Sequence, residues 1–155
     1  MLLPFFEWCE STSIASTIQN SVWLFPVIEA VHLLGLCLLG GSILLVDLRL
    51  MGFGLTRQTV SQLSHQARPW MVVAVIAMIV TGLPLFLSEA IKCYYNQAFW
   101  VKITTLPFAL MFTLLIRDRI ARADRGGAYI RATTGAASIA LWFVVAAAGR
   151  WIGFS

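Results

Sequence analysis

A carboxylate and an imidazole lie three residues apart inside an otherwise apolar stretch of this chain. Glu29 and His32 belong to the run 22–46, which is built mainly of aliphatic residues and glycine. An ionisable side chain at mid-depth in a membrane costs at least about 2.5–3.5 kcal/mol, so it rarely persists without a partner or a task. Residues i and i+3 share a helix face. The pair therefore predicts a site that binds a ligand, a cofactor or a metal through His32, or that exchanges protons.

Three further ionisable side chains map to the same half of the protein. Counting about 1.5 Å per residue puts Glu29 about 10 Å and His32 about 15 Å into the hydrocarbon. Glu89, Lys102 and Arg150 fall in the outer quarter of other segments. We expect the two acids and two bases to pair around His32. The alternatives are that the outer three extend to the headgroups and that Glu29 and His32 only fix helix packing.

The composition describes a membrane protein that folds as one domain over residues 1–155. Of its 155 residues, 59% are hydrophobic and 12% are charged, which is too apolar for an ordinary soluble domain. Spans need about 20 mostly apolar residues, and alternation typical of strands is absent. We predict an all-α fold, an antiparallel bundle of four transmembrane helices preceded by an amphipathic interfacial helix over residues 1–20. The expected spans are 22–46, 69–87, 99–116 and 135–152.

Basic residues predict the orientation of these spans. They concentrate in the connections after the first and third spans, namely Arg49, Arg57, Arg68, Arg117, Arg119, Arg122, Arg125 and Arg131. The positive-inside bias makes these connections cytoplasmic and both termini periplasmic, as for a multi-pass protein of a bacterial inner membrane. The net charge of +4 is then a topology signal and does not indicate nucleic-acid binding.

Two cofactors suit a histidine at this depth. A haem b could take His32 together with Met78 or Met111, which both fall near mid-depth, whereas His65 lies about half a bilayer away. A quinone needs only one or two hydrogen-bonding groups in an apolar cleft. No nucleophile elbow, paired zinc histidines or phosphate-binding glycine loop occurs, so no catalytic residue is assigned.

Two of the three cysteines map to the outer side of the membrane. Cys9 precedes the first span and Cys93 lies between the second and third spans. An oxidising compartment would allow a disulfide there. Sequence alone does not decide whether their Cα atoms come close enough.

Four segments carry a resemblance that covers most of the chain: Trp23-Leu-Phe-Pro-Val-Ile-Glu-Ala-Val-His-Leu-Leu-Gly35, Asp47-Leu-Arg-Leu-Met-Gly52, Thr81-Gly82 and Phe99-Trp-Val-Lys102. The chain resembles an uncharacterised family of small four-helix bacterial inner-membrane proteins. More remotely, its first helix is similar to copper-resistance-D-type proteins and to membrane protoporphyrinogen oxidases. That similarity implies metal-linked or haem-linked redox chemistry, although the second membrane histidine of a simple b-type cytochrome is missing here.

These observations favour an accessory or anchor component of membrane redox metabolism that holds a quinone or haem and is not an enzyme on its own. Two other hypotheses remain open: a structural subunit of a larger complex, and a small conductor of metal ions or protons. The expected partners are the lipid bilayer and either other membrane subunits or further copies of the chain. Nucleic acid is not expected.

The arginine asymmetry makes the orientation testable. Reporter fusions placed after Arg57 and after Arg125 should read cytoplasmic, and fusions at Tyr95 and Ser155 should read periplasmic. Paired reporters that are active on opposite sides of the membrane provide the measurement. An arginine-rich connection found outside would contradict the orientation.

Overall fold

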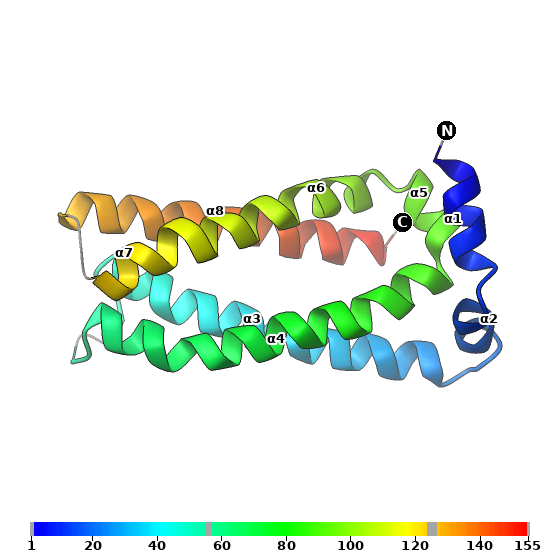
Figure 1. The fold of residues 1–155 in the computed structure, drawn as a ribbon, viewed down its shortest axis with the longest axis horizontal. Helices are drawn as coiled ribbons and strands as arrows, with labels where there is room; N and C mark the ends of the chain where they lie inside the picture. The colour runs from blue at the N-terminus through cyan, green and yellow to red at the C-terminus, as the bar shows by residue number, and fades with distance from the viewer. Residues whose placement is uncertain (1, 55–56, 124–126, 155) are drawn as a thin grey trace.

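Four long helices form the body of the protein (Figure 1). The computed structural model describes residues 2–54, 57–123 and 127–154, and none of these residues lies in a strand. The long helices are α3 (Leu24–Leu50), α4 (Val60–Ser88), the continuous rod of α6 (Gln97–Met111), η1 (Phe112–Arg117) and α7 (Asp118–Ala123), and α8 (Ala128–Ile152). Each is long and apolar enough to cross a membrane.

Each long helix extends beyond its predicted span at one end or at both, although α3 begins at Leu24, two residues inside the predicted start. The largest extension is at the start of α4, where the expected span begins at Pro69 and the helix begins nine residues earlier. Thr59 caps this start, because its side chain accepts a hydrogen bond from the Gln62 backbone and the Gln62 side chain accepts one from Thr59. The helix then continues through Pro69, which removes a single backbone hydrogen bond.

The N-terminal segment forms two short helices, α1 (Leu3–Glu10) and α2 (Ser13–Gln19), where the sequence predicts one. Hydroxyl groups cause the break. Ser11 donates to the Trp8 carbonyl and Thr12 to the Cys9 carbonyl, and Thr12 also caps α2. With α5 (Ala90–Tyr95), these helices lie at the end of the molecule where both chain ends are marked (Figure 1). We call this the α1–α5 end.

The long helices pack as α3 against α4 and α8, and as α6 against α8. The central core contains Leu39, Ile43, Met71, Trp142 and Val145. At one position the approach of two helices is very close: a Cβ atom on Gly135 would lie 2.6 Å from the Asp47 carbonyl oxygen. Glycine at this position is what allows α8 to reach α3.

A buried ion cluster joins the helices at the opposite end from α1 and α5. The Arg117 guanidinium donates to Asp47 of α3 at 2.7 Å, to Asp118 at 2.8 Å and to the Ile43 carbonyl at 3.1 Å. Arg117 is 2% exposed, Asp47 0% and Asp118 1%. Arg117 is therefore buried and is not a loop arginine, although the basic pattern places it in the connection after the third span. The sequence predicts a group of ionisable residues in the outer half, whereas this cluster lies in the other half.

The buried arginine lies at the end of the π-helical segment η1. A π-helical turn inserts extra backbone into an α-helix and so rotates the face that follows it. Thr113 and Arg117, four residues apart, both point inward and are almost fully buried. Thr113 accepts a hydrogen bond from the Trp142 indole at 2.9 Å, which ties the same segment to α8.

Removing the guanidinium should destabilise the protein strongly. Arg117→Met leaves the buried Asp47 without its cation and Asp118 with only Arg122, at 3.7 Å, and breaking such a buried pair costs about 3–5 kcal/mol. The exposed neighbour Arg119 provides the control through Arg119→Met. Equilibrium unfolding in mixed detergent micelles measures both free energies. Equal values within about 0.5 kcal/mol would contradict the proposed importance of the cluster.

Candidate functional site

His32 is held by a short chain of hydrogen bonds to α4. Its Nδ1 atom lies 2.8 Å from the Thr81 hydroxyl oxygen, and that hydroxyl lies 2.6 Å from the Ala77 carbonyl. A carbonyl only accepts, so the Thr81 proton goes to Ala77 and the Thr81 oxygen accepts from His32. This arrangement assigns the proton of a neutral imidazole to Nδ1. The Nε2 lone pair is left as an acceptor or a ligand.

Two glycines make room for this contact between α3 and α4. A Cβ atom on Gly82 would lie 3.1 Å from Cε1 of His32, so a larger residue there would press on the ring. One turn along α3, a Cβ on Gly35 would lie 3.4 Å from the Met78 sulfur. The ring therefore packs edge-on against a glycine of α4, which fixes its position as well as its proton.

Lys102 is the second polar group directed into this region. Its side chain is half-buried and lies over Gly149, where a Cβ atom would be 3.4 Å from the ammonium nitrogen. The ammonium group acts electrostatically on both the His32 imidazole and the Cys93 thiol. Among the residues that the structure describes, no hydrogen bond or ion pair reaches Lys102. A half-buried cation without a partner is available for a ligand.

The structure corrects the expected pairing of the other charged residues. Glu29 is exposed and makes no hydrogen bond or ion pair with any described residue, so it does not pair with Lys102. Positions three apart on a helix differ by about 60° in direction, and the turn that brings His32 to α4 directs Glu29 outward. Glu89 instead lies 3.8 Å from Lys92, and Arg150 lies 4.3 Å from the Phe154 ring centre.

The two methionines considered as haem ligands occupy different environments. Met78 packs on the central core with its sulfur beside Gly35. Met111 is 57% exposed on α6. Within the described parts of the chain, no three His, Cys, Asp or Glu side chains gather closely enough to hold a metal ion. A metal at His32 would therefore have fewer than three ligands of these types among the described residues.

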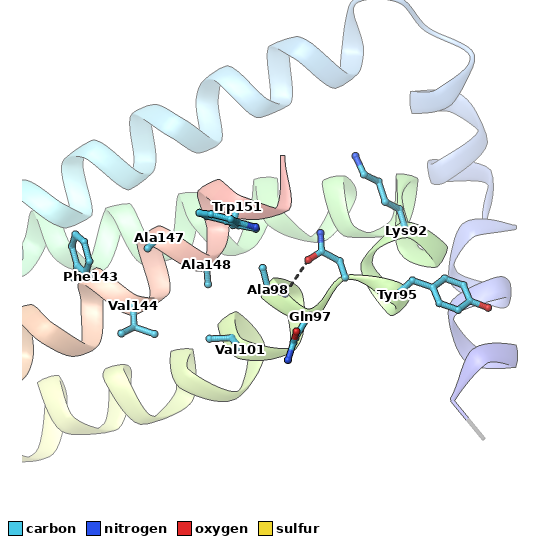
Figure 2. Close-up of a pocket in the computed structure, with 11 residues that line it drawn as sticks. Lys92, Tyr95, Gln97, Ala98, Val101, Phe143, Val144, Ala147, Ala148 and Trp151 are labelled. Carbon is cyan, nitrogen blue, oxygen red and sulfur yellow. Dashed lines mark hydrogen bonds between the residues drawn. The ribbon is translucent and has the colours of Figure 1, made fainter. Parts of the chain in front are cut away.

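A separate groove of about 780 Å³ lies between α6 and α8 near the α1–α5 end (Figure 2). Alanine, valine and aromatic side chains form most of its wall, and its polar side chains come from one end, residues 92–97. The full lining is Lys92, Tyr95, Asn96, Gln97, Ala98, Val101, Phe143, Val144, Ala147, Ala148 and Trp151. None of the predicted site residues lines this groove.

Sequence reasoning names Thr81 only within the Thr81-Gly82 segment of the family resemblance and gives it no role, although it is the direct partner of His32. A usable signal was present. Thr81 lies seven residues from the end of α4 and His32 lies eight from the start of α3, so two antiparallel helices bring them to similar depth. The following glycine, Gly82, marks a place of close helix approach.

Comparison with known proteins identifies the family. The model of a family of unknown function (DUF6644) matches residues 5–155, so the chain belongs to that family. No curated protein and no solved structure matches the chain. The remote similarity to copper-resistance-D-type and protoporphyrinogen-oxidase-type proteins finds no support in these comparisons.

Loss of the Thr81 hydroxyl should cost stability. Thr81→Val leaves the His32 Nδ1–H without its acceptor, and an unsatisfied buried donor costs about 1–3 kcal/mol. Thr104→Val is the matched control, because the Thr104 hydroxyl bonds only carbonyls of its own helix and is exposed. Detergent unfolding compares the two. A Thr81→Val protein as stable as the control would show that the hydrogen bond does not hold His32.

Proposed function

We propose that this protein binds a quinone between His32 and Lys102 and acts as an accessory or anchor component of membrane redox metabolism. In this proposal, the long helices form an antiparallel bundle across a bacterial inner membrane, with the α1–α5 end on the periplasmic face. The observation that carries the proposal is the Nδ1 contact of His32 with Thr81, which leaves Nε2 as a fixed acceptor. The apolar spans supply the membrane setting.

The two side chains match the two redox forms of a quinone. A quinone carbonyl accepts hydrogen bonds, and the Lys102 ammonium donates three. A quinol hydroxyl donates, and Nε2 of His32 accepts. The two groups project from different helices, α3 and α6, and in this proposal one ring with an oxygen on each side contacts both. Such a site binds the ring by a few placed polar groups within apolar walls.

The same residues suit a haem less well. Met111 lies at the surface, and Met78 fills the contact with Gly35. The edge of the His32 ring also packs against Gly82. A haem bound at His32 would need its second ligand from elsewhere, whereas a quinone needs none.

A second role, as a subunit of a larger membrane complex, is supported by Glu29. Its carboxylate is exposed on α3 about 10 Å into the apolar region and makes no bond within the described residues. Exposure of such a group to lipid is costly. A basic or hydrogen-bonding side chain of another subunit would satisfy it.

Quinone binding is testable on the purified full-length protein. Titration with a short-chain ubiquinone analogue, followed by isothermal calorimetry in mild detergent, should show saturable binding. His32→Ala and Lys102→Met should each weaken it about tenfold, since one hydrogen bond contributes about 1–1.5 kcal/mol. Span α3 keeps enough apolar length without His32, so membrane insertion should survive.

Two control variants test whether a loss of quinone binding is specific to the proposed site. His65→Ala and Lys92→Met remove an exposed histidine and an exposed lysine, and both should bind as the original protein does. No saturable binding, or equal loss in the site and control variants, would overturn the quinone proposal. A haem spectrum that survives His32→Ala would also contradict a role for this side chain.

A further inference from the structure

Two buried cysteines lie where the N-terminal helix α1 packs against α5. Cys9 is 2% exposed and Cys93 is 6% exposed, and both belong to one buried cluster with Phe6, Ala90 and Phe99. The third cysteine, Cys37, is exposed on α3. All three are thiols in this structure.

The backbones that carry the two thiols are fixed to each other. The Glu10 carboxylate accepts a hydrogen bond from the Ile91 backbone at 2.7 Å. Glu10 directly follows Cys9, and Ile91 precedes Cys93 by two residues. Phe6, one turn before Cys9, also contacts Tyr94 with ring centres 5.2 Å apart. The contacts on both sides of the cysteines hold α1 and α5 in one register.

The faces of the two helices also match. Phe6 and Cys9 lie at i and i+3 on α1, and Ala90 and Cys93 lie at i and i+3 on α5. Each pair is the buried face of its helix. The two faces pack into the same buried cluster, which therefore contains both cysteines.

We propose that Cys9 and Cys93 form an intramolecular disulfide that fastens α1 to α5. The proposal requires that the α1–α5 end face an oxidising compartment, as the arginine distribution predicts, and it does not require quinone binding. The bond would clamp the two N-terminal helices over one end of the long helices. Gln19 already anchors α2 there through the Ser88 carbonyl.

The oxidant in this proposal is a disulfide-carrying donor protein of the same compartment. The thiolate of one cysteine attacks a donor sulfur, forms a mixed disulfide and displaces the other donor sulfur as a thiolate. The second cysteine then attacks the bonded cysteine sulfur. An S–S bond forms in this chain, the donor becomes a dithiol, and the two thiol protons pass to the donor.

The surroundings of the two thiols predict at which stage of folding the thiol–disulfide exchange takes place. Burial raises the pKa of the Cys9 thiol, and burial together with the Glu89 carboxylate raises the pKa of Cys93 to about 11. Little thiolate is therefore present near neutral pH while α1 is docked. Oxidation should occur before α1 packs, and the finished bond should resist reductants in the folded protein.

Thiol counting on the full-length protein tests the proposal. A Cys37→Ser protein is prepared from membranes without reductant, denatured in SDS and labelled with a maleimide, and its intact mass is measured. We expect no label before reduction and two labels after it. In the same background, Cys9→Ser and Cys93→Ser should each take one label without reduction, because each leaves one unpaired thiol.

Two results would overturn the proposal. Labelling of both thiols in the unreduced Cys37→Ser protein would show that no bond forms. A dimer on a non-reducing gel that disappears in Cys9→Ser would show that the thiols pair between chains. If the thiols are free, the reporter fusion at Tyr95 distinguishes a wrong orientation from a pair that fails to close in an oxidising compartment.

Discussion

The arrangement of the long helices depends on one buried guanidinium. Arg117 lies in the middle of a cluster that joins α3 to the rod of α6 and α7, through Asp47, Asp118 and the Ile43 carbonyl. Moving these charges out of water costs desolvation free energy. Well-oriented hydrogen bonds from the guanidinium N–H groups are needed to offset that cost. Trp142 and the glycine at 135 bring α8 to the same region. A fixed contact at this end leaves the helices fewer ways to slide past one another.

The buried cluster and the proposed ligand site share helices. α3 carries both Asp47 and His32, and the α6 rod carries both Arg117 and Lys102. Locking the two helices at Asp47 and Arg117 therefore limits how far His32 and Lys102 can separate at the other end. Thr81 adds the finer constraint, because it fixes the ring and its proton. The site is thus positioned by contacts on rigid helices rather than on loops.

The sequence predicted the features that depend on local pattern. Long apolar runs predicted four helices of spanning length, and the depth of His32 marked it as a polar residue of the interior. The sequence did not reveal which helix face each charge occupies in three dimensions. Arg117 resembles its neighbours Arg119 and Arg122 in the sequence but is buried at the end of the π-helical segment, and Glu29 was expected to pair although its face points outward. The early start of α4 was readable from Thr59 and Gln62, since their spacing is that of a capping box.

The central claim is that His32 presents an unprotonated Nε2 to a quinol in the membrane. Nitrogen-15 NMR of the imidazole in lipid tests this most directly, because His65→Gln leaves a single histidine to observe. We expect a protonated Nδ1, an unprotonated Nε2, and an Nε2 resonance that shifts when a short-chain ubiquinol is added. A ring protonated at Nε2 with a bare Nδ1, or an Nε2 resonance unchanged by saturating quinol, would contradict it.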